Sequence, residues 1–388
     1  MPMKIYYFLF ILSFGLFYSQ SSKTMLVQDA TDGKPVIHAR ILINNEVFYT
    51  NDDGKVPISE NASNIEVYAG NYEKIILKNF TTLVKLKPRV RNIKEVQIRN
   101  YNNVASLIKS VYKKYGKLYY TKPSLYNAIY KQKNTRNEEI SMLLVADMDL
   151  WTLDNMYHPI YVRRKDFDSF VQADLHKIKY YKSIENNTAF NGSSLDSSKD
   201  FIGDMFFNYT LYKLDKFVRM KDAKIDGKII DEDGDLITIS FKLFSPKYKV
   251  TNTGFFIYHK TDKVITHLEM NYDQGDVKPF KTINEADEEY RYMTTNGEVI
   301  FDFYKLNDKY LPSFAHTSGE YYMLYDDQKH TGTFNREITF SQFYKSDIKG
   351  LTNKIDFGKK LWKNIQSGEV KATSVLLSEE ERRFIESK

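Results

Sequence analysis

The chain is 388 residues long and carries 56 basic and 50 acidic side chains, which leaves a formal charge of +6. Because these charges nearly cancel and no basic run dominates, nothing in them indicates nucleic-acid binding. The chain contains no cysteine, which excludes disulfides, thiolate catalysis, cysteine metal ligands and a lipid anchor on a cysteine. Its 30 tyrosines and 26 phenylalanines favour half-buried β-strands over helices.

Residues 1–20 have the pattern of an export signal. Lys4 supplies a positive start, and an apolar run from Ile5 to Tyr18 follows. This run is shorter than the roughly 20 residues of a membrane-spanning helix, so we expect a signal peptide that is removed on export. An uncleaved N-terminal anchor is the alternative, because Tyr18 and Gln20 make a poor cleavage site. No later segment is apolar for long enough to span a bilayer as a helix, so we expect a periplasmic or secreted protein of the cell envelope.

A chain of this length exceeds one ordinary core, so we expect two domains after the signal. Residues 21–99 contain short apolar segments about ten residues apart. Turn residues separate these segments at Asp29–Pro35 and again at Asn51–Gly54, where glycine accepts a positive φ. Several short strands at this spacing predict a β-sandwich.

The two turn motifs also carry a family resemblance. The segments Val27–Val36, Ala39–Ile43 and Thr50–Val56 resemble the carboxypeptidase regulatory-like domain found in envelope proteins of Bacteroidetes. The resemblance implies a seven-stranded, transthyretin-like sandwich that serves as an adhesion or docking module and is not itself a peptidase.

The second domain is expected to span residues 100–388. A helix near 103–116 is predicted from apolar residues that recur on one stripe, and packing of this stripe onto a sheet is the expected outcome. Its members are Val104, Leu107, Ile108, Val111 and Tyr115. Residues 378–388 are predicted to form a short charged C-terminal helix, and the polar run 182–200 is predicted to be a mobile surface loop.

Long segments of alternating apolar and polar residues predict an antiparallel meander that curls into a half-barrel. In 236–243 the residues Leu236, Ile239, Phe241 and Leu243 are expected to face the core. The turn at Lys260–Lys263 predicts a hairpin, and Asn296–Gly297 is read as a two-residue hairpin turn.

This region resembles the large domain that follows a regulatory-like module in many Bacteroidetes envelope proteins, and through it the half-barrel of the periplasmic lipoprotein carriers. The segments that carry the resemblance are Tyr119–Pro123, Ile129–Gln132, Gly254–Tyr258 and Phe357–Asn364. Lys131 and Gln132 stand where the family often has an Arg-Glu pair, so this sequence lacks the family's carboxylate at that position.

Catalytic patterns are absent from the sequence. The seven histidines never form the His-x-x-x-His spacing of helical zinc sites, and neither a Gly-x-Ser-x-Gly elbow nor a phosphate-binding glycine loop occurs. The acidic cluster Asp231–Asp235 is read as a hairpin turn and not as a calcium loop. We therefore predict a protein that is not an enzyme, with no catalytic residues, no metal and no cofactor.

The remaining candidates are aromatic side chains on neighbouring predicted strands, which would bind a lipid-like or lipoprotein-like ligand if one curved face were open. They are Phe255, Tyr258, Tyr290, Tyr292, Phe301, Phe303 and Tyr321. Ordinary core packing explains the same rings, and the alternative function is a structural or protein-binding factor with a filled core, whose expected partner is an envelope protein. A second alternative is a hydrolase of envelope polymers that uses Glu288 or Glu289.

Overall fold

A computed structural model describes residues 22–43, 46–70, 72–88, 99–157, 167–184, 202–275, 277–283, 288–347, 350–357, 364–365 and 377–387. The chain divides into two compact units. Unit 1 comprises residues 1–89 with 374–378, and unit 2 comprises residues 90–373 with 379–388. The predicted signal at 1–20 and most of the predicted loop at 182–200 lie outside the described residues, as do 358–363 of the C-terminal motif.

Unit 1 is a β-sandwich, as expected. Its described residues form β1 (Ser22–Asp29), β2 (Arg40–Ile43), β3 (Glu46–Tyr49), β4 (Lys55–Ser59), β5 (Ser63–Tyr68), β6 (Ile75–Asn79) and β7 (Leu83–Leu86). One sheet has the order β4-β1-β7 and the other the order β3-β2-β5-β6. Alternate residues of both sheets, among them Val27, Ile41 and Val67, are fully buried in one shared core.

The two predicted turns of unit 1 have the geometry that their residues imply. Asp29 Oδ1 accepts a hydrogen bond from the backbone N–H of Thr31 at 2.6 Å. Gly54 has a φ of +73°, and a Cβ there would lie 2.6 Å from the carbonyl oxygen of Val27. Glycine is therefore required at this turn, because the strand of Val27 passes too close for any side chain.

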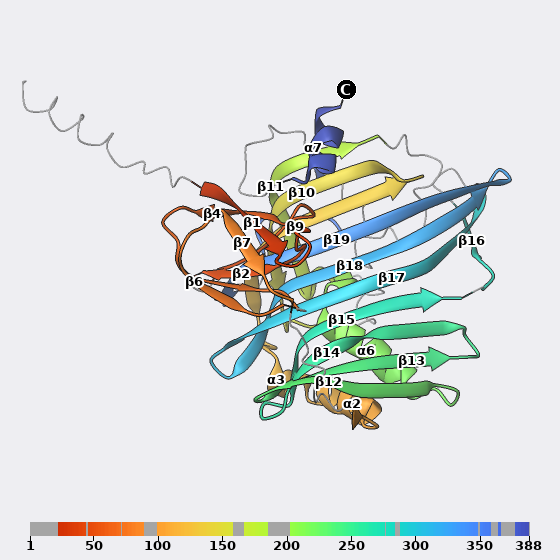
Figure 1. Ribbon diagram of the computed structural model, residues 1–388. Helices are drawn as coiled ribbons and strands as arrows, with labels where there is room; N and C mark the ends of the chain where they lie inside the picture. Colours follow the sequence, from red (N-terminus) through yellow and green to blue (C-terminus); the bar gives the residue numbers. More distant parts are fainter. Residues whose placement is uncertain are drawn as a thin grey trace, which may run out of the picture. The chain divides into compact units, whose positions relative to one another are not determined.

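Unit 2 is built on a 12-stranded, entirely antiparallel sheet with the order β11-β10-β9-β19-β18-β17-β15-β14-β13-β12-β8, and β16 pairs with β17 (Figure 1). This confirms the mainly β fold class with a large curved sheet and few helices. Its strands are β8 (Arg99–Asn100), β9 (Ser124–Arg136), β10 (Glu139–Thr152), β11 (Val171–Ser183), β12 (Lys224–Asp233), β13 (Leu236–Ser245), β14 (Val250–His259), β15 (Val264–Gln274), β16 (Phe280–Ile283), β17 (Glu289–Leu306), β18 (Lys309–Tyr325) and β19 (Gln328–Lys345).

One buried row crosses eight strands of this sheet. Its members face each other in register from β13 to β10, and each is at most 1% exposed: Ile239, Phe256, Leu268, Phe301, Ala315, Ile338, Tyr130 and Ala146. Directly paired residues of antiparallel strands point to the same side. We call this side the inner face and the opposite side the outer face.

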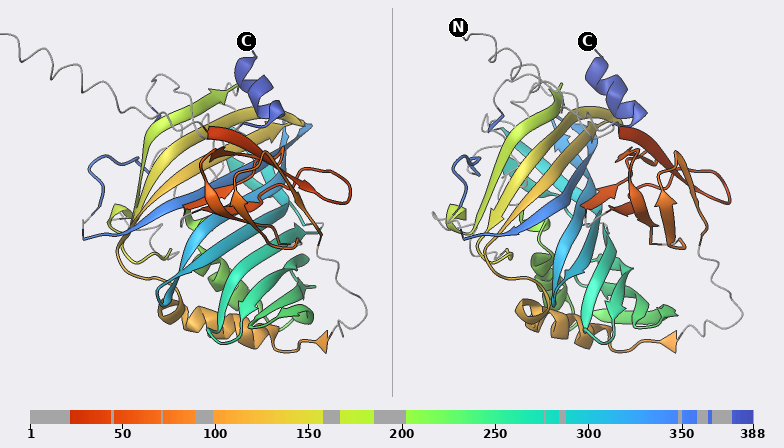
Figure 2. Two further views of the ribbon diagram at one scale, coloured as in Figure 1. Left: turned by 60° about the vertical axis from the view of Figure 1, so that its left-hand side comes forward. Right: turned by 90° about the vertical axis from the view of Figure 1, so that its left-hand side faces the viewer.

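Helices cover the inner face. They are α2 (Val104–Lys113), α3 (Tyr115–Leu118) and α6 (Phe207–Phe217), and the buried residues of α2 and α6 belong to the same core as the inner row. Figure 2 shows α6 lying against the sheet where it bends. Four members of the predicted stripe, Val104, Leu107, Ile108 and Val111, are buried on α2 as expected. Tyr115 is also buried but lies in α3, because α2 ends at Lys113.

Two local predictions were wrong. Asn296–Gly297 is not a hairpin turn, because β17 runs through it with a register shift between Thr294 and Asn296, and the chain reverses at Asn307–Asp308. A β-bulge places an extra residue inside a strand, so an Asn-Gly pair there does not reverse the chain. In β13, Ile237 and not Leu236 faces the core, since Leu236 is 38% exposed.

Two further helical segments are η2 (Phe167–Ser169) and the C-terminal α7 (Glu379–Glu386), and α7 confirms the predicted charged helix. Helix α7 contacts β10 and β11. Among the described residues, the helices are too short or too polar to cross a membrane.

Candidate functional site

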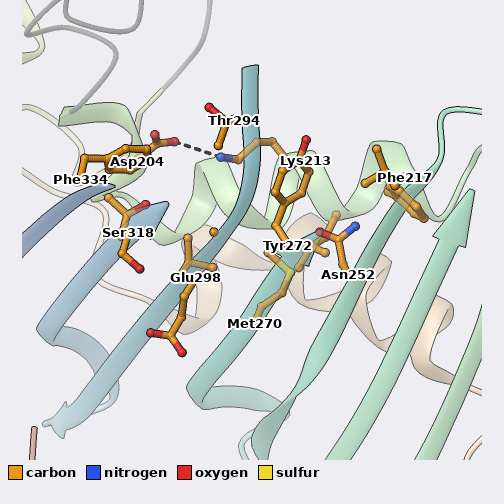
Figure 3. Close-up of a pocket in the computed structure, with 15 residues that line it drawn as sticks. Asp204, Lys213, Phe217, Asn252, Met270, Tyr272, Thr294, Glu298, Ser318 and Phe334 are labelled. Carbon is orange, nitrogen blue, oxygen red and sulfur yellow. Dashed lines mark hydrogen bonds and ion pairs between the residues drawn. The ribbon is translucent and has the colours of Figure 1, made fainter. Parts of the chain in front are cut away.

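A cavity of about 320 Å³ lies between α6 and the inner face of unit 2 (Figure 3). This volume is at the lower end of the range for small-molecule pockets, roughly 300–1,000 Å³. Helix α6 contributes Lys213, Leu214 and Phe217. The other lining residues are Asp204, Val250, Asn252, Met270, Tyr272, Thr294, Gly297, Glu298, Val299, Thr317, Ser318 and Phe334.

The cavity lies beside the filled inner row. The next inner-face row contributes Met270, Val299 and Thr317 to its lining, and the row after that contributes Asn252, Tyr272 and Gly297. Phe301 and Phe303 fill the space under the start of α6 by packing on Phe207, with ring centroids 5.3 and 4.9 Å apart. Toward the end of α6 the lining residues leave a space open between the helix and the strands.

An ion pair marks one end of the cavity. Lys213 Nζ lies 3.0 Å from Asp204 Oδ1, with the two side chains 46% and 33% exposed. Burial lowers the pKa of Lys213, but the Asp204 carboxylate more than offsets this, so the pKa lies above its usual value. Figure 3 shows Thr294 beside this pair. The rim is therefore polar, charged and reached by solvent.

The walls are mostly apolar, with Leu214, Phe217, Met270, Val299 and Phe334 on different sides. Glu298 contributes little charge to the interior, since its carboxylate is on the outer face. There Glu298 Oε2 lies 3.5 Å from Nε2 of His316, and Figure 3 shows the carboxylate directed away from Lys213.

Two polar lining side chains are buried, Asn252 at 7% and Thr317 at 5% exposed. Asn252 is paired with Tyr272 across β14 and β15, whereas Thr317 lies on β18 opposite Val299. These groups give the apolar interior two separate positions that can make hydrogen bonds.

All seven aromatic residues predicted as ligand contacts are described, and none of them lines this cavity. Phe301 and Phe303 belong to the core under α6, and Tyr258 packs against its edge. Phe255 is on the outer face, stacked on His267 with ring centroids 5.3 Å apart. Tyr292 and Tyr321 stack on each other at 5.4 Å, and Tyr290 is buried.

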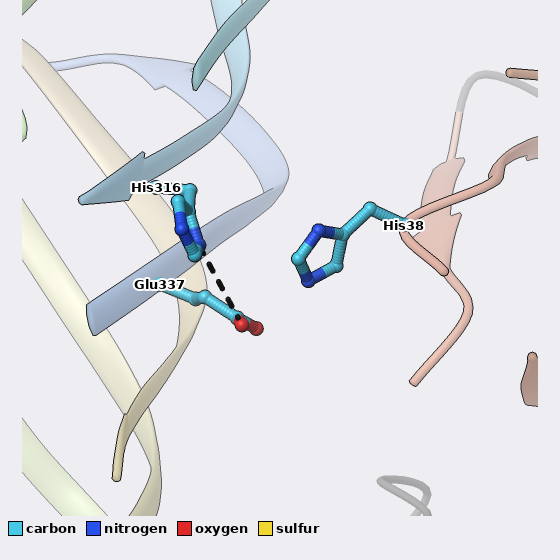
Figure 4. Close-up of side chains that lie close together, drawn as sticks. All are labelled: His38, His316 and Glu337. Carbon is cyan, nitrogen blue, oxygen red and sulfur yellow. Dashed lines mark ion pairs between the residues drawn. The ribbon is translucent and has the colours of Figure 1, made fainter. Parts of the chain in front are cut away.

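The outer face carries pairs of a histidine and a carboxylate. The two members of each pair are far apart in the sequence, so a local spacing of histidines does not reveal them. His316 lies between Glu298 and Glu337 of the neighbouring strands, and Figure 4 shows its approach to Glu337, with Nδ1 to Oε1 at 3.7 Å. Burial lowers the pKa of His316, but the two carboxylates raise it to about 9.

A second histidine on the outer face pairs with an aspartate. Nδ1 of His267 lies 2.7 Å from Oδ1 of Asp302. Burial lowers the pKa of His267, but the carboxylates of Asp302 and Glu269 together raise it above its usual value. Both histidines therefore have neighbouring carboxylates that favour the charged imidazolium.

The aromatic pattern that predicted ligand contacts does not mark the cavity residues. One usable signal is Gly297, a glycine that the structure places inside β17 and in the cavity lining. Glycine within a strand often marks a bulge or the close approach of a backbone or ligand.

Known proteins add little to this geometry. No known protein family matches the chain, and neither does any curated protein. Lipovitellin, in a structure that describes lipid–protein interactions, aligns with 61% of this chain and 27% of its own at 8% identity and a TM-score of 0.25. A protein of unknown function from Bacteroides fragilis aligns with 83% of this chain and 98% of its own at 9% identity and a TM-score of 0.14. Both TM-scores are too low to define a shared fold.

Proposed function

We propose that unit 2 binds one apolar ligand, such as an acyl chain, in the cavity between α6 and the inner face. The observation that carries this proposal is the cavity of about 320 Å³ whose walls are formed by Leu214, Phe217, Met270 and Val299. Each methylene group moved from water into such a site contributes about 0.8 kcal/mol. A chain of several methylenes therefore binds through burial alone, while the polar rim at Lys213 faces solvent.

The biological setting belongs to the same proposal. The protein is exported to the cell envelope, acts there without catalysis, and uses unit 1 as an adhesion or docking module. The motif resemblance of residues 21–99 to the carboxypeptidase regulatory-like domain and the signal-like pattern at 1–20 support this view. A structural factor with a filled core is the competing function, and binding measurements separate the two.

The binding proposal is tested by filling the cavity. We expect the environment-sensitive dye N-phenylnaphthylamine to bind the wild-type chain and to be displaced by dodecanol. Val299→Trp places an indole in the cavity, so dodecanol affinity should fall by about tenfold or more, a change of about 1.4 kcal/mol or more.

The matched control is Leu236→Trp, which adds the same ring at an exposed position away from the cavity. It should leave dodecanol affinity unchanged. Thermal unfolding of both variants confirms that each is folded. Equal dodecanol affinity in wild type and Val299→Trp, or no binding in wild type, would leave the filled-core function in place.

Export is tested by expressing the full chain in a bacterium and sequencing the N-terminus of the protein found in the envelope fraction. A mature terminus close to residue 21 supports a removed signal. An intact Met1 in a membrane fraction supports the uncleaved anchor instead.

A further inference from the structure

The most informative polar group in the cavity is the Asn252 amide. Asn252 is 7% exposed and lines the cavity on β14. Figure 3 shows its amide rising from the strand toward α6 beside Phe217. Within the part of the chain that the structure describes, this amide makes no side-chain hydrogen bond, although it offers two N–H donors and one carbonyl acceptor.

Polar groups that lie in a mostly apolar cavity are nearly always satisfied by protein, water or ligand. Leucine fits the same space without needing such a partner. Since Asn252 lies in the lining of a mostly apolar cavity, the partner expected there is a group on the bound molecule.

We propose that Asn252 hydrogen-bonds an uncharged polar group, an amide or a hydroxyl, of a long-chain amphiphile whose chain occupies the cavity. This inference rests on the proposed function and adds the ligand class. A hydroxyl or an amide donates and accepts, as the Asn252 side chain does, so each can satisfy it.

The charges at the cavity argue against a charged head group at Asn252. An ionised group among Phe217, Leu214 and Met270 would lose its hydration without a cation beside it. The cation of the cavity, Lys213, is paired with Asp204 at the half-exposed rim. Rim ion pairs of this kind contribute little energy.

The test compares dodecanamide with chlorododecane, which has the same chain and lacks the hydrogen-bonding group. Both are titrated against N-phenylnaphthylamine bound to the full chain. The wild type should bind dodecanamide roughly tenfold more tightly than chlorododecane, and Asn252→Leu should lose this preference. Because leucine removes an unpartnered amide, Asn252→Leu without ligand should unfold at an equal or higher temperature than the wild type.

Asn271→Leu is the matched control, because it makes the same substitution at an exposed position of β15 that does not line the cavity, and it should keep the preference for dodecanamide. If Asn252→Leu does not fold, Asn252→Ala replaces it in the same comparison. If dodecanamide and chlorododecane bind the wild type equally, or if the preference survives Asn252→Leu, this inference is overturned and the proposed function stands. Tighter binding of dodecanoate that depends on Lys213 also overturns it. If no compound displaces the dye, the proposed function itself fails.

Discussion

The ammonium Nζ of Lys131 in β9 lies 2.7 Å from Oε1 of Glu381 in α7, and Glu381 is completely buried. Lys133, two residues along the same strand, approaches the same oxygen at 3.8 Å. This ion pair therefore ties α7 to the sheet of unit 2.

Lys131→Met should lower the free energy of unfolding by about 3 kcal/mol, because a buried carboxylate that loses its partner is strongly destabilising. Lys133 retains part of the interaction and keeps the loss from being larger. Urea denaturation measures this difference. The double variant Lys131→Met with Glu381→Leu removes both charges and should recover most of the stability. A double variant as unstable as Lys131→Met would show that the charge is not the cause.

His316 should make stability depend on pH. Its pKa of about 9 in the folded protein lies above the ordinary 6.5, since the carboxylates of Glu298 and Glu337 outweigh burial. A raised histidine pKa stabilises the fold fully below pH 6.5, and this contribution is lost as pH rises through 9. His316→Gln should therefore flatten the fall in unfolding free energy between these pH values. An equally steep fall in His316→Gln would show that other groups control this pH range.

Gly227→Ala should destabilise unit 2 by about 1–3 kcal/mol, because it overpacks the contact of β12 with α2. A Cβ at Gly227 would lie 2.2 Å from Cγ2 of Val104 and 2.8 Å from the carbonyl oxygen of Tyr101. Gly116→Ala is the control, since the nearest atom there is 3.4 Å away and Gly116 lies in the helix α3. Thermal unfolding compares the two. Similar melting temperatures for both variants would contradict the tight approach of α2.

Phe303→Ala should cost about 3–5 kcal/mol of stability, as expected for a large ring removed from a core. The ring packs on Phe207 at 4.9 Å and on Tyr119 at 5.0 Å, and it does not line the cavity. Dodecanol affinity, measured by dye displacement at a temperature where the variant is folded, should change little. A large loss of affinity with little loss of stability would instead make Phe303 a ligand contact.

The strand predictions succeeded where a local pattern determines the outcome. The hairpin of β14 and β15 around Lys260–Lys263 was predicted from alternation and turn residues, and His259 pairs with Val264 as expected. The prediction at Asn296–Gly297 failed because the same dipeptide serves a turn or a bulge, and the pairing of Gly297 with Gly319 on β18 decides between them. Long-range register is not encoded in a short window.

By itself, the sequence determined the mainly β class, the sandwich of unit 1, the apolar stripe of α2 and the charged C-terminal helix, since periodicity, turn chemistry and composition are properties of neighbouring residues. Tertiary structure alone decided where space remains. The cavity between α6 and the inner face depends on Leu214 and Phe217 of a helix meeting Met270, Val299 and Phe334 of separate strands. Whether such side chains fill a volume or leave it open is set by their packing in three dimensions, which no local pattern specifies.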